Sequence, residues 1–184
     1  MIIDLRGNYG GSDDLAADMS GFFYSAPSFY ESQAYYDKRN GQFTPITVGE
    51  HPPFVVANIS INPQTPHFGG PVVVLVNPAT TSSGEGPAMA ISRLPNGRVI
   101  GFHGTDGSFG MTGGEITMPG GYTIEYPYGR SLDQNGVIQM DSKNGIGGVA
   151  PNPRVPMTQE NVLAFAAGTD VELQYAIDYL SSRH

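Results

Sequence analysis

Apolar residues gather in short runs along the chain, and the most continuous run is Val-Val-Val-Leu-Val at residues 72–76. A short apolar run with Gly-Pro before it and Asn-Pro after it predicts a strand buried on both faces. The following segment, residues 84–94, fits a helix that is closed by Pro95-Asn96-Gly97. The pattern therefore predicts a central strand–turn–helix unit.

A second unit of the same kind opens the chain. Residues 2–5 predict a strand, and a glycine-rich stretch at residues 7–11 follows it. Ser12 is a good N-cap residue for the helix that comes next. The apolar positions of this helix recur at helical spacing and are Leu15, Met19, Phe22 and Phe23.

The remaining apolar segments predict mostly β structure. Residues 29–36 and 42–48 flank Asn40-Gly41, a hairpin signal, and residues 54–61 add a strand. The three tyrosines of this hairpin, Tyr30, Tyr35 and Tyr36, fit either one packed face or a substrate groove. Later segments are expected to be strands at 98–102, 116–118, 122–126 and 132–140, loops at 103–114 and 145–156, and a last helix at about 170–181 with Leu173, Ala176, Ile177 and Leu180 on one face.

The alternation of strands and helices, with hairpins inserted, predicts an α/β layer fold in one domain over residues 1–184. A net charge of −8 argues against a nucleic-acid partner, which needs a basic surface. The chain has no cysteine, so disulfides and thiolate metal sites are excluded. No apolar run approaches the roughly 20 residues of a membrane span, and the histidines have no ligand spacing. We therefore expect no cofactor and no metal.

A cluster of hydroxyl side chains, residues 80–83, lies between the end of the buried strand and the start of the helix. In open α/β sheets this crevice is where ligands bind. A helix N-terminus also offers unpaired N–H groups and a partial positive charge that suit a developing oxyanion. Alternatively, Ser82 and Glu85 have the spacing of a capping box, in which the serine caps the helix and the glutamate reaches back to it.

The glycine-rich stretch at residues 7–11 matches neither the Walker pattern nor the dinucleotide-binding fingerprint. A phosphate cradle is therefore disfavoured. A backbone donor for an oxyanion and an ordinary tight turn are the two remaining uses of this loop.

The two strand–loop–helix units resemble two motifs of the C-terminal processing (tail-specific) serine peptidases, the family that includes the tricorn protease core. Residues 3–11 resemble its Asp-Leu-Arg-x-Asn-x-Gly-Gly signature, and residues 76–85 are similar to its nucleophile segment. Residues 97–101 match the strand that trails the nucleophile helix. Residues 148–156 and 170–177 resemble the closing loop and the last helix, so the likeness covers nearly the whole chain.

This resemblance implies a ClpP/crotonase-like core of repeated ββα units with inserted β-hairpins. It also implies a peptide or protein substrate and a location that leans towards the extracytoplasmic space. The chain starts abruptly within an apparent strand at Met1, so we expect it to be the C-terminal part of a serine peptidase catalytic region. Self-association through the sheet edge, or association with the missing N-terminal part, is then expected.

The resemblance also implies roles for individual residues. Ser82 falls in the nucleophile position, and the backbone N–H of Ser83 falls in the oxyanion hole. The second oxyanion donor comes from the first motif, here Gly10 or Gly11. The implied reaction is peptide hydrolysis through an acyl-enzyme on Ser82.

The general base is where the chain departs from its family. Tail-specific members place a lysine where this chain has Met111, and Lys143 lies outside the matching segment. The tricorn-like branch takes a histidine from upstream of the first motif, and Asp141 is the nearest match to its further carboxylate. His103 is the internal alternative, because it lies in the loop where the lysine-type enzymes keep their base.

Three hypotheses follow from these observations. The chain is a peptidase subdomain that needs an upstream histidine, a self-contained peptidase that uses Ser82 and His103, or a non-catalytic module that binds peptides or other ligands. The departure at Met111 favours the first and the third over a serine–lysine enzyme.

Overall fold

The computed structural model describes residues 1–45, 58–140, 142 and 148–182. Within these ranges no helix is long and apolar enough to cross a membrane. The elements follow one another as β1 Ile2–Asp4, α1 Asp13–Ser20, η1 Gly21–Phe23, β2 Ser28–Asp37, β3 Gln42–Pro45, β4 Asn58–Ile61, β5 Val72–Leu75, η2 Ser82–Gly84, α2 Glu85–Ser92, β6 Gly97–Ile100, β7 Gly110–Thr117, β8 Thr123–Leu132, α3 Gln159–Ala166 and α4 Val171–Ser181.

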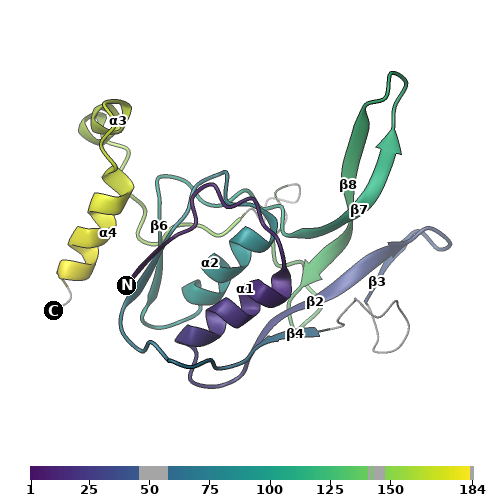
Figure 1. Ribbon diagram of the computed structural model, residues 1–184, viewed down its shortest axis with the longest axis horizontal. Helices are drawn as coiled ribbons and strands as arrows, with labels where there is room; N and C mark the ends of the chain where they lie inside the picture. The colour runs from purple at the N-terminus through teal and green to yellow at the C-terminus, as the bar shows by residue number, and fades with distance from the viewer. Residues whose placement is uncertain (46–57, 141, 143–147, 183–184) are drawn as a thin grey trace.

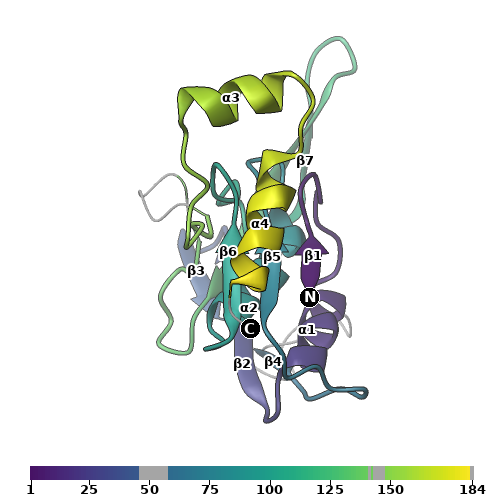
Figure 2. The same cartoon turned by 90° about the vertical axis from the view of Figure 1, so that its left-hand side faces the viewer.

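A three-stranded parallel sheet in the order β1-β5-β6 forms the centre of the fold. The predicted apolar strand is its middle strand, β5. Val72, Val74 and Val76 pack with residues of α1 and α2, whereas Val73 and Leu75 pack with residues of α4. Figure 2 shows α4 on one face of this sheet, and Figure 1 shows α1 and α2 side by side. The prediction of a strand buried on both faces is confirmed.

Helix α1 starts where the sequence predicts, because the Ser12 side chain accepts a hydrogen bond from the N–H of Leu15 at 3.3 Å. Its predicted apolar face is wrong. Leu15 is 68% exposed, and the buried positions are Ala16, Ala17 and Ser20. Small side chains let α1 pack closely on α2, and the larger residue Phe23 is buried from η1 instead. The sequence predicted the helical spacing correctly, but it did not predict which side of α1 is buried.

The second sheet is antiparallel, with the strand order β3-β2-β8-β7 and with β4 also paired to β2. Its predicted first hairpin is confirmed as far as Pro45; residues 46–57 lie outside the described ranges. The β7–β8 hairpin extends away from the rest of the molecule (Figure 1). Its strands run over 110–117 and 123–132, so the loop predicted to reach residue 114 ends sooner. Two register shifts, at residues 111–114, accommodate the glycine-rich start of β7.

Two further assignments near the C-terminus need correction. The strand predicted at 132–140 does not form, because Asp133 folds the chain into a turn by accepting hydrogen bonds from the N–H groups of Asn135 and Val137. Helix α3 was not predicted from the sequence. It has eight residues and buries none of them, so its apolar pattern carries no core signal. The last helix, α4, is confirmed, with Asp170 as its N-cap.

The three tyrosines of the first hairpin do not share a face. Tyr30 is fully buried in the core. Tyr35 contacts the ring of Tyr128 at 5.1 Å between centroids, and Tyr36 contacts Phe43 at 5.4 Å. All three rings are therefore used in packing against other residues.

A cluster of charges joins the loop after β1 to the start of α4. Arg6 forms ion pairs with Asp4 and Asp170, each at 2.7 Å, and with Glu172 at 3.1 Å. The carboxylate of Glu172, which is buried, also accepts a hydrogen bond from the N–H of Phe102 at 2.7 Å. Hydrogen bonds from Arg6 lower the pKa of Asp4 and of Asp170. Arg6 thus connects β1, the end of β6 and α4.

Replacing Arg6 by Gln is expected to lower the free energy of unfolding by about 2 kcal/mol. Removing one partner of a buried ion pair costs roughly 3–5 kcal/mol, and water screening of the half-exposed Asp4 and Asp170 reduces this. Carboxyl groups with a lowered pKa contribute their full stability above the ordinary value near 3.8 and lose it as the pH falls below that value. The difference in stability between the wild type and Arg6→Gln should therefore shrink as the pH falls from about 5 to about 3. Urea unfolding at several pH values measures this.

Arg39→Gln is the matched control, because the Arg39 side chain is 91% exposed in its pair with Asp37. No measurable change in unfolding is expected for it. Equal effects of the two substitutions would contradict the role given to Arg6.

Candidate functional site

Ser82 lies at the junction between the central strand and the helix that follows it. Thr81 before it is extended, whereas Ser82 has a φ of 53° and opens η2. Among the described residues it is the one non-glycine residue with positive φ. Such a conformation costs on the order of 1–3 kcal/mol and persists only where the surroundings hold it. The side chain is half-buried, so it is accessible from solvent.

The segment that carries Ser82 is held by the loop after β1. Because β1 and β5 are parallel neighbours, both loops leave the same edge of the sheet. The hydroxyl of Thr80 donates to the carbonyl of Leu5 at 2.9 Å, and the N–H of Thr81 donates to the carbonyl of Asn8 at 2.9 Å. Asn77 accepts from the N–H of Gly7 at 3.1 Å. These bonds fix the glycine-rich loop beside Ser82.

Gly10 is in direct contact with Ser82. A Cβ added to Gly10 would lie 2.7 Å from Cβ of Ser82, 3.1 Å from its Oγ and 3.2 Å from the backbone nitrogen of Ser83. The hydroxyl of Ser83 donates to the carbonyl of Gly11 at 3.1 Å. The structure thus brings together four of the predicted site residues: Gly10, Gly11, Ser82 and Ser83.

The N–H groups of these residues differ in whether they already donate a hydrogen bond. The N–H of Gly10 already donates to the side chain of Asn8 at 2.9 Å. The N–H of Gly11 has no acceptor among the described residues. Ser83 belongs to the first turn of a helix, where N–H groups have no acceptor within the helix. Gly11 and Ser83, rather than Gly10, therefore have backbone N–H groups that remain available as donors.

The predicted capping box of Ser82 and Glu85 does not form. Glu85 is fully buried and turns towards the loop after β6, where it accepts hydrogen bonds from the N–H of Gly107 at 2.9 Å, from the N–H of Ser108 at 2.8 Å and from the hydroxyl of Thr105. Neither η2 nor α2 has a side-chain cap. The positive φ of Ser82 is incompatible with the extended backbone of a capping residue.

Sequence reasoning missed this role of Glu85. The available signal was a lone charge in the otherwise uncharged segment 84–92, since a carboxylate on a buried helix must find donors. The loop that supplies them is in turn fixed to residues 148–149, because the Thr105 hydroxyl accepts from the N–H of Val149 at 2.7 Å. Helix α2 is thus anchored on a second loop.

The candidate bases are not joined to Ser82. His103 has an exposed side chain and forms no hydrogen bond with Ser82 in the structure. Met111, at the position of the family's lysine, lies in β7 opposite Gly129. Asp141 and Lys143 lie outside the described residues. The parts of the chain that are described contain no cluster of three His, Asp or Glu that could hold a metal.

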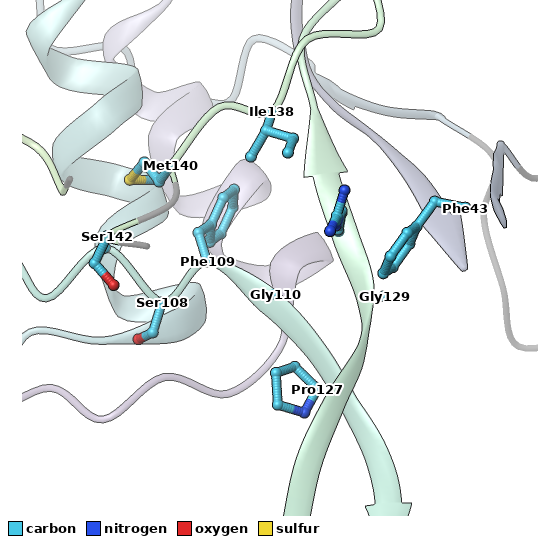
Figure 3. A pocket seen from close by; sticks show the side chains of 11 residues that line it. Phe43, Ser108, Phe109, Gly110, Pro127, Gly129, Ile138, Met140 and Ser142 are labelled. Carbon is cyan, nitrogen blue, oxygen red and sulfur yellow. The ribbon is translucent and has the colours of Figure 1, made fainter. Parts of the chain in front are cut away.

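A hollow of about 330 Å³ lies beside the loop that donates hydrogen bonds to Glu85. Gly107 and Ser108 form part of its wall. Figure 3 shows the apolar side chains around it, which come from β3 and β8 of the antiparallel sheet, from the loop before β7 and from the segment before residue 142. The guanidinium of Arg130, which also lines the hollow, lies 3.6 Å from the ring centre of Phe43. The lining includes Phe43, Phe109, Pro127, Ile138 and Met140.

A serine with positive φ on a strand-to-helix turn, next to backbone N–H groups in an α/β core, is an arrangement that serine hydrolases use. A family model, peptidase family S41, matches residues 1–155. The chain therefore belongs to peptidase family S41, and this membership supports a peptidase role.

Solved structures of other proteins share the fold. A predicted peptidase from Parabacteroides merdae superposes with a TM-score of 0.70 at 23% identity, over 97% of this chain and 51% of that one. The photosystem II D1 C-terminal processing protease gives a TM-score of 0.51 at 20% identity, over 93% and 39% of the two chains. The tricorn protease gives 0.58 at 18% identity, over 97% and 14%.

These similarities confirm the predicted ClpP/crotonase-like α/β fold. The chain spans about half the length of the Parabacteroides protein, 51% of it. No curated protein matches the sequence.

Gly10→Ala is expected to destabilise the protein more than Gly7→Ala. Both glycines have positive φ, at 104° and 73°, so both substitutions introduce backbone strain. Only at Gly10 would the new Cβ meet Ser82, whereas at Gly7 it would meet nothing within 4 Å. The extra overpacking should cost about 1–3 kcal/mol in urea unfolding. Equal losses in the two variants would show that Gly10 does not constrain Ser82.

Proposed function

We propose that this chain carries the nucleophile and the oxyanion donors of a serine endopeptidase that hydrolyses peptide bonds through an acyl-enzyme on Ser82. The observation that carries the proposal is the positive φ of Ser82, held in contact with Gly10. Strain of this kind clusters at functional sites, and here a capping role for the serine is absent.

The proposed reaction has two steps. Oγ of Ser82 attacks the carbonyl carbon of the scissile bond, and its proton passes to a base. The carbonyl oxygen becomes an oxyanion, the C–N bond breaks, and the amine leaves with that proton. A water molecule then attacks the ester on Ser82 and releases the acid, which regenerates the hydroxyl.

The oxyanion is proposed to bind the N–H groups of Ser83 and Gly11. Both are backbone donors, so they are held by the fold without the cost of ordering a side chain. The Gly10 N–H is used by Asn8, which supports Gly11 over Gly10 for this role. Losing one such donor typically costs about 3–4 kcal/mol of transition-state stabilisation.

The base is proposed to come from a histidine upstream of residue 1, as in the tricorn-like branch that the sequence resembles, with Asp141 as the further carboxylate. In support of this proposal, none of the described side chains accepts a hydrogen bond from Ser82. Residues 1–184 would then form one domain, the C-terminal part of the catalytic region. His103 is the competing base within the chain.

A non-catalytic binding module is the second candidate function. The missing hydrogen bond between Ser82 and a base in the described residues favours it. In this case the same fold would bind a peptide without cleaving it, and the hollow beside loop 105–108 is a candidate for the bound side chain.

Fluorophosphonate labelling tests the proposal. The probe reacts with an activated serine, so the wild-type protein joined to its upstream segment should be labelled and the Ser82→Ala variant should not. Ser108→Ala, which removes an exposed serine in the neighbouring loop, should label like the wild type.

His103→Ala distinguishes the two bases. Full labelling of this variant supports the upstream histidine, and loss of labelling by 10²-fold or more supports His103. If no form of the protein is labelled and the wild type nevertheless binds peptides, the binding module is the correct function.

A further inference from the structure

Two buried polar residues follow one another on β2. The pairing of β2 with β4 shifts its register between Phe29 and Glu31, which is the signature of a β-bulge. As a result both Tyr30 and Glu31 are fully buried, although alternate residues of a regular strand face opposite sides. The Tyr30 hydroxyl packs against Gly86 of α2, so β2 lies against the nucleophile helix at this point.

Glu31 is poorly satisfied for a buried carboxyl group. Its Oε1 accepts a hydrogen bond from the side chain of Gln33 at 2.8 Å, whereas its Oε2 has no partner and is shielded from solvent. It forms no ion pair with any described residue. A fully ionised carboxylate in such a place is costly, because no cation neutralises it and the donors around it do not replace all of the lost water.

Asp13 is the group that faces it. Asp13 is the first residue of α1, two positions after Gly11, and its Oδ1 is likewise buried without a partner. The two carboxyl groups lie close enough to interact with each other, and Asp13 also lies close to the hydroxyl of Ser83. Two carboxylates can only accept hydrogen bonds, whereas one proton placed between them gives both orphaned oxygens a partner.

The electrostatics agree with one shared proton. Burial and the charge of Asp13 raise the pKa of Glu31 to about 8. Burial also raises the pKa of Asp13, while contacts with Ser83 and Glu31 act against this rise. The direction of these shifts favours Glu31 as the residue that carries the proton. The other groups facing the pair are Asp14 of α1, Tyr30 and Tyr35 of β2, Ser131 of β8, and Arg93 at the end of α2.

We propose that Asp13 and Glu31 share one proton and act as a positioning pair for the oxyanion donors of Ser82. Asp13 is linked to Gly11 through one residue of backbone, and Gly11 is bonded to Ser83 through the Ser83 hydroxyl. Holding Asp13 against β2 therefore holds Gly11 and Ser83 in place. The catalytic part of this inference rests on the proposed function, whereas the shared proton does not.

Loss of the proton has a defined consequence. When Glu31 ionises, two anions meet in a buried site, and their repulsion separates the start of α1 from β2. A carboxyl whose pKa is raised in the folded state stabilises the fold at low pH, and this stabilisation is lost between its unfolded value near 4.5 and about 8. In this window the unfolding constant should rise by up to about tenfold per pH unit.

The first test is urea unfolding of the protein between about pH 5 and pH 9. The wild type should lose stability as the pH rises. Glu31→Gln should remove this pH-dependent loss, because its amide donates to Asp13 as the protonated acid does and cannot ionise. Asp14→Asn is the matched control: it removes a negative charge from the same turn, but Asp14 is exposed and should keep the wild-type pH dependence.

The second test is the pH profile of fluorophosphonate labelling at Ser82. One pH unit above the pKa only about one molecule in ten retains the proton. The labelling rate of Glu31→Gln divided by that of the wild type should therefore rise about tenfold from pH 7 to pH 9. The same ratio for Asp14→Asn should stay constant. A merely structural glutamate would shift rates without this pH dependence.

Each outcome decides one part of the proposal. Parallel unfolding curves for wild type and Glu31→Gln at all pH values would overturn the shared proton. The expected unfolding curves with a constant labelling ratio would overturn the positioning role. Absence of labelling in every form would overturn the proposed function, while the unfolding series would still decide the shared proton.

Discussion

The parallel pairing of β1 with β5 is the constraint on which the candidate site depends. Register places Asp4 beside Leu75, so the two loops leave the sheet together. Hydrogen bonds from the segment at residues 80–81 to the first loop then bring a glycine into contact with Ser82. Because any Cβ at that position would collide with the serine, the pairing and the glycine are needed together. The strained backbone of Ser82 follows from both.

Two buried acids lie near Ser82, and they are satisfied in opposite ways. Glu85 accepts hydrogen bonds from two N–H groups and one hydroxyl, so both of its carboxyl oxygens have partners that the fold provides. Glu31 faces Asp13 and has one side-chain donor from its own strand. Burial without enough donors favours the neutral acid. The first glutamate therefore anchors α2 to the loop after β6, and the second is the residue proposed to share a proton with Asp13.

Apolar runs and capping residues in the sequence correctly predicted the strands and helices whose formation depends on neighbouring residues in the chain. The central strand was clear because all residues of the run 72–76 are apolar, and α1 and α4 begin at good capping residues, Ser12 and Asp170. The features that the sequence did not predict depend on contacts between residues that are far apart in the chain. The buried side of α1 is chosen by close packing on α2, and the donors of Glu85 lie about 20 residues further along the chain. The family resemblance predicts a nucleophile at Ser82, whereas its spacing to Glu85 alone suggested a cap, which does not form.

The loop at residues 105–108 connects the start of α2 to the neighbouring hollow. One side of this loop donates to Glu85 at the start of α2, and Gly107 and Ser108 also form part of the wall of the hollow. A buried charge with three donors resists displacement, because moving the loop would leave the carboxylate without partners. The wall of the hollow and the helix that follows Ser82 are therefore coupled.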